Sequence, residues 1–202
     1  MNLAERWPRL VGGDAALDFV NTDLFSQADR STDVLRSAEE FVAWCAHAGV
    51  ASPSSATVHL SRAQEQAFLR EADEVRTAIR MIVEAIAARR DFDPAALTTL
   101  RSAYADAVGR AAPTLDGGGL SWAWEPPSPH GALSVLVGAA VDLLRHGAVD
   151  RIKACPNCGF VFLDTTRNGS RRWCSMEDCG GQEKMRRYVT KRAETRKQLR
   201  GR

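Results

Sequence analysis

Residues 155–179, CPNCGFVFLDTTRNGSRRWCSMEDC, hold four of the five cysteines of this 202-residue chain. The cysteines form two close pairs, Cys155-x2-Cys158 and Cys174-x4-Cys179, with 15 residues between the pairs. Two close pairs at such a separation are typical of a structural zinc site. Zinc prefers four tetrahedral ligands, and four thiolates leave no coordination position open for a substrate. We therefore predict that these four cysteines bind one structural Zn²⁺ ion.

Two other interpretations of the cysteines are a redox-active Cys-x-x-Cys pair and cysteines that bind no ligand. A redox pair of the thioredoxin type would need a βαβ setting, which the preceding sequence does not predict. In a reducing cytosol, clustered cysteines bind metal more often than they form disulfides. The fifth cysteine, Cys45, lies in the apolar pattern of a helix, and we expect it to be a buried core residue.

The residues between the cysteine pairs predict a β-hairpin with a wide loop. Asn168-Gly169 is a strong turn signal. A two-residue turn, however, would hold the second cysteine pair too far along the strands from the first for the two to share a metal. We therefore expect short strands at residues 160–163 and 171–173, with Arg167 and Asn168 at the loop tip.

The two ends of the chain carry opposite charge. Residues 1–150 hold 13 Lys and Arg against 20 Asp and Glu, a net charge of −7. Residues 151–202 hold 14 against 5, a net charge of +9. This asymmetry predicts two modules, residues 1–150 and 151–202, the second of which faces a polyanion.

The residues after Cys179 predict a basic helix that completes a treble-clef-like finger. Met185, Tyr188 and Val189 lie at helical spacing, and we expect this stripe to pack on the hairpin while the basic face meets phosphates. The alternative is a solvated, charged helix. The side chains expected to contact nucleic acid are Arg167, Asn168, Arg171, Arg172, Gln182, Lys184, Arg186 and Arg187.

One finger offers only a small interface with DNA, so useful affinity predicts a homodimer. The resulting hypothesis is a DNA-binding regulator whose N-terminal module dimerises or senses a ligand. A second hypothesis is a zinc-stabilised protein-interaction module whose basic helix binds an acidic partner.

Residues 1–150 predict a helical domain that includes a β-hairpin, so the fold class is mainly α with small hairpins. Ser37 and Ser61 show the capping-box pattern before helical runs, and Pro94 opens a further helix. Leu120, Trp122 and Trp124 alternate with small or polar residues after a Gly-rich turn, which predicts a strand. The apolar run that follows predicts a core helix.

The N-terminal module offers weak signals for chemistry. No nucleophile–base or paired-carboxylate spacing indicates catalysis, so we expect a protein that is not an enzyme. Asp18, Asn21 and Thr22 interrupt an apolar opening helix, and either line a small-molecule pocket or face solvent and cap neighbouring elements. The N-terminus lacks the apolar region of a secretory signal, and the longest apolar stretch is shorter than a span of about 20 residues. We expect a cytoplasmic protein with no membrane contact.

The run CPNCGFVFLDTTRNGSRRWCSMEDCG, followed by KMRRY, resembles the CGNR zinc finger, and LVGGDAALDFVNT resembles the opening of the ABATE domain that accompanies it. The two resemblances together cover nearly the whole chain and imply a bacterial stress-response transcription regulator. The chain departs from the finger's pattern at Gly181 and Gln182, where the family has Asn and Arg. This departure keeps the metal ligands but removes a positive charge at the start of the last helix. Gln182 could still hydrogen-bond a base edge, most naturally adenine.

Overall fold

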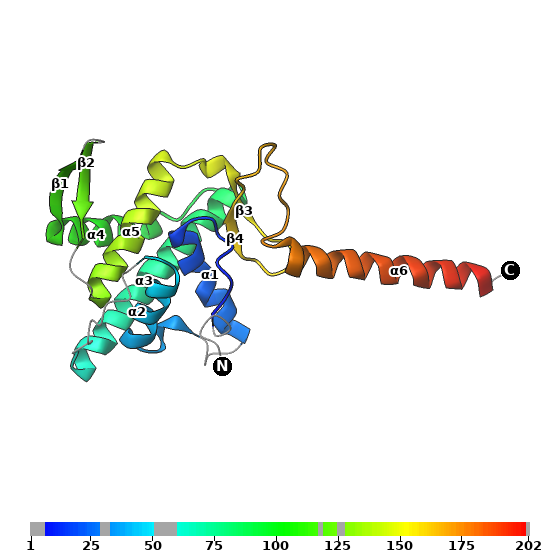
Figure 1. Cartoon of the computed structure of the whole chain (residues 1–202), viewed down its shortest axis with the longest axis horizontal. Coiled ribbons are helices and arrows are strands. Elements are labelled where there is room, and N and C mark those ends of the chain that lie inside the picture. Colours follow the sequence, from blue (N-terminus) through cyan, green and yellow to red (C-terminus); the bar gives the residue numbers. More distant parts are fainter. Residues whose placement is uncertain (1–6, 29–32, 51–59, 117–118, 125–127, 201–202) are drawn as a thin grey trace.

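The computed structural model describes residues 7–28, 33–50, 60–116, 119–124 and 128–200. It shows a helical body from which one long helix, α6 (Gly181–Arg200), projects (Figure 1). The body contains α1 (Ala15–Ala28), α2 (Ala38–His47), α3 (Arg62–Ala87), α4 (Pro94–Arg110) and α5 (Pro129–His146). The predicted mainly helical fold with small hairpins is confirmed.

The helices begin where the sequence predicts because short polar side chains satisfy their first backbone N–H groups. Before α3, Ser61 accepts a hydrogen bond from the Gln64 backbone while the Gln64 side chain accepts one from the Ser61 backbone, a complete capping box. Before α2, the Ser37 hydroxyl accepts from the Glu40 backbone. The end of α2 is followed by Gly49 at a φ of 70°, a left-handed conformation that glycine adopts without strain.

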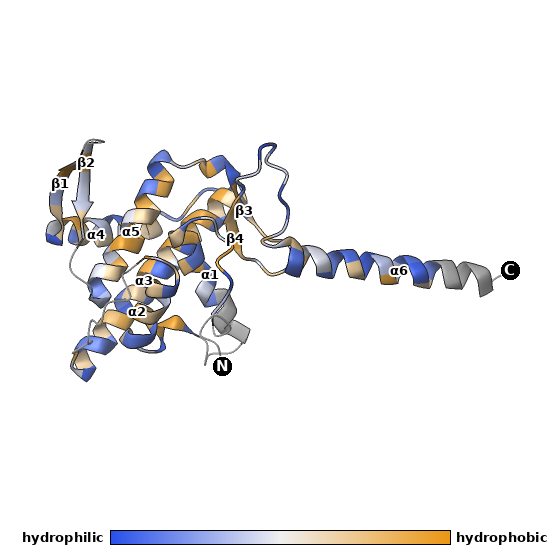
Figure 2. Cartoon of the chain, in the orientation of Figure 1, coloured by the Kyte–Doolittle hydropathy of each residue, from blue (hydrophilic) through white to orange (hydrophobic). Residues whose placement is uncertain are grey.

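The core lies between α1, α2, α3 and α5. It is rich in aromatic rings, with Phe19, Phe41 and Phe68 following one another at centroid distances of 5.9 Å and 5.3 Å. Cys45 is buried among these helices, as predicted. Figure 2 shows that the body mixes polar and apolar residues, whereas the described part of α6 is dominated by hydrophilic ones. No helix in the described ranges has both the length and the apolar content needed to cross a membrane.

The first hairpin forms from β1 (Ala112–Asp116) and β2 (Gly119–Ala123), which pair antiparallel. Just beyond β2, Trp124 reaches α5, where its ring lies against Gly138. A Cβ atom added at Gly138 would come within 2.6 Å of that ring. The absence of a side chain at this position therefore allows the hairpin to dock on the body.

The second sheet departs from the sequence-based expectation. It pairs β3 (Ile152–Ala154) with β4 (Val161–Leu163), so the partner strand lies before the first cysteine pair. The expected strand at residues 171–173 is wrong, because its first backbone N–H donates to the Asp164 carboxylate at 2.9 Å and joins no ladder. Ile152 and Val161 belong to the same buried core as the helices. These two residues of the finger therefore extend the core of the helical body, whereas Phe162 and three of the cysteines form a second cluster.

We predict that Gly138→Ala destabilises the protein by about 1–3 kcal/mol, because the new methyl group would displace the Trp124 ring. Urea unfolding followed by circular dichroism would measure the change. The matched control is Gly109→Ala on α4, where an added Cβ meets nothing within 4 Å. An equal response of the two variants would contradict the proposed docking of Trp124.

Candidate metal centre and nucleic-acid interface

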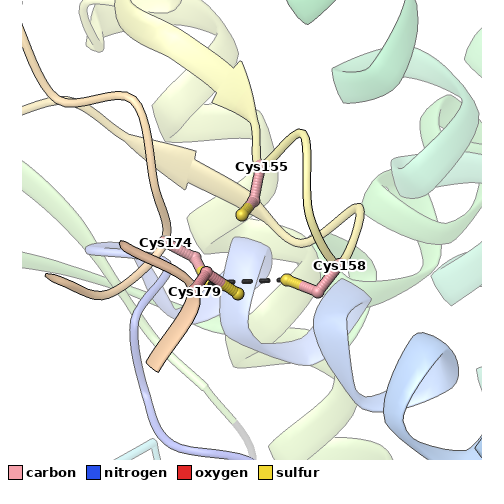
Figure 3. Close-up of side chains that lie close together, drawn as sticks. All are labelled: Cys155, Cys158, Cys174 and Cys179. Atoms are coloured by element: carbon pink, nitrogen blue, oxygen red, sulfur yellow. Dashed lines mark hydrogen bonds between the residues drawn. The ribbon is translucent and has the colours of Figure 1, made fainter. Parts of the chain in front are cut away.

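The first cysteine pair lies on a tight turn at the end of β3. The Gly159 backbone donates to the Cys155 carbonyl at 2.8 Å, and the Cys155 backbone donates to the Phe160 carbonyl at the same distance. Gly159 has a φ of 79°, which glycine adopts more readily than other residues. The turn directs both sulfur atoms, on Cys155 and Cys158, to the same side (Figure 3).

The second pair flanks the turn that leads into α6. Cys174 ends the long loop, and Cys179 lies in a short helical turn, Met176–Gly180. The Ser175 hydroxyl accepts hydrogen bonds from the Glu177 and Asp178 backbones at 3.2 Å and so starts that turn. The irregular x4 spacing thus accommodates a turn of helix between the last two ligands.

The four sulfur atoms fit a tetrahedral zinc ion. All lie within 4.8 Å of one another, with Cys158 and Cys174 at 3.5 Å and Cys174 and Cys179 at 3.6 Å. A tetrahedron with zinc–sulfur bonds of about 2.3 Å has edges of roughly 3.8 Å. These separations are far longer than a disulfide bond of about 2.05 Å. The donor set suits a structural zinc ion, which would hold the two pairs together and take no part in a reaction.

The thiol of Cys155 is the one whose surroundings most favour the thiolate. Burial opposes its ionisation, but hydrogen bonds from the backbones of Cys174, Asn157 and Cys158 lower its pKa. Backbone N–H groups that point at a sulfur atom stabilise its negative charge, and metal binding requires that charge.

Asp164 organises the loop between the cysteine pairs. Its side chain is fully buried and accepts hydrogen bonds from Lys153 Nζ at 2.6 Å, from Thr166 Oγ1 at 2.6 Å and from the Arg171 backbone at 2.9 Å. Burial opposes ionisation, but these bonds from Lys153, Thr166 and Arg171 lower the pKa of Asp164 well below its ordinary value. Lys153 also donates to the Gly169 and Arg171 carbonyls at 2.6 Å and 3.0 Å.

Arg171 has a structural role in the finger, and its contact with nucleic acid stays a prediction. Its guanidinium lies 4.4 Å above the Phe162 ring and is partly buried. It donates to the carbonyls of Val11 at 2.9 Å and Trp173 at 3.1 Å, and also to that of Cys174. Because these carbonyls occupy several of its donors, Arg171 binds the loop to the N-terminal segment.

Gln182 also has a partner within the protein. Its Oε1 accepts a hydrogen bond from Asn157 Nδ2 at 2.9 Å, and Asn157 Oδ1 accepts one from Arg186 at 3.2 Å. The two contacts join the start of α6 to the turn that carries the first cysteine pair. An arginine side chain has no acceptor atom, so at position 182 it could not receive this hydrogen bond from Asn157. The glutamine that stands in place of the family's arginine therefore makes a contact that arginine could not make.

The predicted packing of the α6 stripe on the hairpin is wrong. Met185, Tyr188 and Val189 are 62%, 56% and 58% exposed. The reason is geometric: α6 leaves the body directly after Cys179 and extends away from both sheets (Figure 1). The helix therefore presents its apolar stripe as well as its basic residues to the surroundings.

The remaining predicted contact residues lie at the surface. Arg167, Asn168 and Arg172 are exposed on the long loop, and Lys184 is exposed on α6. Arg186 and Arg187 are about two-thirds exposed and pair with Glu183 at 3.0 Å and 2.8 Å. Exposed pairs of this kind contribute little to stability and can exchange partners. The structure thus leaves most of the predicted cations accessible.

Asp18 and Asn21 are buried where α1 meets the segments around it. Asn21 donates to the Val161 carbonyl and accepts from the Val161 backbone, both at 2.9 Å. Asp18 accepts from the Gly12 backbone at 2.7 Å. Burial raises the pKa of Asp18 to about 6, while hydrogen bonds from Gly12 and Val11 partly offset this effect.

Thr22 also has its partners inside the protein. Its hydroxyl donates to the Phe19 carbonyl at 2.6 Å and accepts from the buried Arg76 side chain at 3.0 Å. Asp18, Asn21 and Thr22 thus each bind a neighbouring part of the protein, and their role in lining a small-molecule pocket stays a prediction.

Several cations in and around the finger make contacts that no local sequence pattern predicts. Lys153 alternates with apolar residues as a surface residue would, yet it joins Asp164 to two carbonyls. Arg151 donates to the Thr166 carbonyl at 2.7 Å, and Arg9 pairs with Glu177 at 2.7 Å. The partners of these cations are distant in sequence or are backbone atoms, so no local pattern marks them.

The fold and site define a helical protein with a structural zinc finger at its C-terminal end. Family models match in two places: ABATE, described as "Putative stress-induced transcription regulator", at residues 13–147, and the CGNR zinc finger at residues 151–192. The chain belongs to the ABATE family and carries the CGNR finger after it, as the resemblance implied. A comparison with curated proteins finds no match.

We predict that the purified protein holds one zinc ion per chain and that Cys174→Ser abolishes its binding. Structural zinc contributes on the order of 10 kcal/mol in finger peptides, so chelation should unfold the finger. Because Ile152 and Val161 lie in the main core, the melting temperature of the helical body should fall as well. Mass spectrometry and thermal unfolding would test this. The control, Cys45→Ala, should keep its zinc; retention of zinc by Cys174→Ser would refute the site.

We also predict that Asn21→Ala lowers the free energy of unfolding by about 2–4 kcal/mol, since it leaves two buried backbone groups unpaired. Denaturant unfolding would measure the loss. Asn21→Asp keeps an acceptor but lacks the donor and buries a carboxyl, so it should also be less stable than wild type. A change below 0.5 kcal/mol for alanine, within the range of ordinary surface substitutions, would contradict a role in joining α1 to β4.

Proposed function

We propose that this protein is a DNA-binding transcription regulator whose finger and α6 contact the phosphate backbone. The observation that carries the proposal is the projection of α6, whose described side chains from Lys184 to Glu194 are all exposed. This stretch holds five Lys and Arg residues against Glu194. Phosphate contacts of this kind supply most of the affinity of non-specific DNA binding and make it dependent on salt.

The long loop adds cations on the same module. Arg167 and Arg172 are exposed, and the loop that carries them is held by Asp164 and Lys153. A fixed loop positions cations without an ordering cost at the moment of binding. The family match supports a regulatory role. This role agrees with the expectation that the protein is not an enzyme. A homodimer would present two such modules to one duplex.

A protein-interaction module is the second candidate, and the exposed stripe of Met185, Tyr188 and Val189 favours it. Phosphate binding does not require three large apolar side chains in water, whereas an amphipathic helix that docks in a groove uses such a stripe. The partner in this case is an acidic protein whose groove accepts the basic edges of α6.

For the first candidate, we predict that Lys184→Gln and Arg187→Gln each weaken duplex DNA binding regardless of sequence. Each should also reduce the slope of log affinity against log salt by about 1, because one phosphate contact is lost. Fluorescence anisotropy with labelled duplexes at several salt concentrations would measure both effects. Arg101→Gln, an exposed site on α4, is the matched control and should change neither. Wild-type zinc-loaded protein without salt-dependent duplex binding would refute the proposal and favour the protein-interaction module.

A further inference from the structure

A cleft of about 750 Å³ lies between the N-terminal segment and the long loop of the finger. Its walls come from residues 9–11 and Gly13 on one side and from Thr166 and residues 170–177 on the other. The volume falls in the range typical of small-molecule sites, roughly 300–1,000 Å³. The cleft lies beside Cys174 rather than along α6, and it shares Arg172 with the loop that the proposed function assigns to phosphate contact.

The walls of the cleft are fixed before any ligand arrives. Arg171 joins the two sides, because it donates to the Val11 carbonyl on one and to the Trp173 carbonyl on the other. The Gly12 carbonyl accepts from the Leu163 backbone at 2.8 Å, which attaches the N-terminal segment to β4. Val11 and Trp173 both pack against the buried zinc ligands. A preformed cleft binds a ligand without the cost of ordering its walls.

The lining combines an aromatic surface with positive charge. Trp173 is half-buried, and Leu10 and Met176 beside it are 41% and 69% exposed. Arg172 lies 5.8 Å from the Trp173 ring and has no carboxylate within ion-pair distance among the described residues. Ser170 and Thr166 line the same space.

One acidic residue lines the cleft, and it forms an exposed ion pair with Arg9. Glu177 pairs with Arg9 at 2.7 Å, and Arg9 also reaches Asp178 at 3.0 Å. Both partners of the Arg9–Glu177 pair are more than half exposed, so the pair is weak and can open. Arg9 can therefore turn from Glu177 to an incoming anion.

We propose that this cleft binds a nucleotide unit, with the base against Trp173 and the phosphate at Arg172 and Arg9. Aromatic side chains bind bases by stacking irrespective of base identity, and arginine binds phosphate through paired donors. A simple anion would leave the apolar wall in water, and an uncharged aromatic would leave Arg172 unused. Either a free nucleotide or an unpaired nucleotide of a strand has the required chemistry.

The test uses the full-length, zinc-loaded protein and calorimetric titration with AMP, GMP and single-stranded oligo(dT). Adenosine and inorganic phosphate are the control ligands, because each lacks one half of the recognised unit. We expect AMP or GMP to bind at least about tenfold more tightly than either control ligand. Binding of oligo(dT) but of neither mononucleotide would support the site and identify a strand as the source.

Variants then place the binding in the cleft. Arg172→Gln and Trp173→Ala should each weaken binding about tenfold, and Glu177→Gln should strengthen it about two- to fivefold by removing a competing carboxylate. Trp173→Phe keeps an aromatic face and should retain most of the binding. This variant separates a loss of stacking from a loss of folding in Trp173→Ala. Arg101→Gln should change nothing.

The outcomes also separate this proposal from that of duplex binding. Lys184→Gln and Arg187→Gln should leave nucleotide binding unchanged while they weaken duplex binding. Absence of binding by every nucleotide probe, or binding that Arg172→Gln and Trp173→Ala leave intact, would overturn the cleft proposal whether or not duplex DNA binds.

Discussion

The outer edge of β4 is the constraint on which the rest of this structure depends. β4 pairs with β3 on one side, so the backbone groups of Val161 and Leu163 on the other side need partners. Asn21 of α1 binds both groups of Val161, and the Gly12 carbonyl binds the Leu163 N–H. A side chain and a segment of irregular backbone thus close a strand edge that would otherwise be open to aggregation.

That closure ties the zinc finger to the helical body. Ile152 and Val161 enter the core between the helices, while Phe162, on the opposite face of β4, packs against the zinc ligands. The alternation of side chains along a strand makes this division possible. The two family matches therefore describe segments of sequence that share a core, and the metal centre bears on the stability of both.

The same attachment shapes the surfaces that the protein offers to ligands. The N-terminal segment is held beside the finger loop by Gly12 and Arg171, which creates the cleft lined by Trp173. On the other side of the zinc site, the Asn157 side chain joins the first cysteine turn to Gln182 and Arg186. These contacts around the four cysteines thus position both the cleft and the start of α6.

Sequence reasoning succeeded wherever the signal is local. The cysteine spacing identified the four ligands because a Cys-x-x-Cys turn places two sulfurs together whatever the rest of the chain does. The capping box at Ser61 and the proline at the start of α4 marked helix starts, since caps involve residues two or three positions apart. The wide finger loop was expected from the metal distances alone.

Only the tertiary structure decided how distant groups pair. The partner of β4 is β3 and not residues 171–173, because the backbone there is bound by Asp164. Arg171 looks like a surface cation in the sequence but donates to the carbonyls of four different residues. Its neighbour Arg172 carries the same charge and is exposed. The sequence determined the metal ligands and the helices, since these depend on near neighbours. The tertiary structure decided which polar side chains serve the fold and which stay exposed, since that depends on contacts between residues up to 169 positions apart.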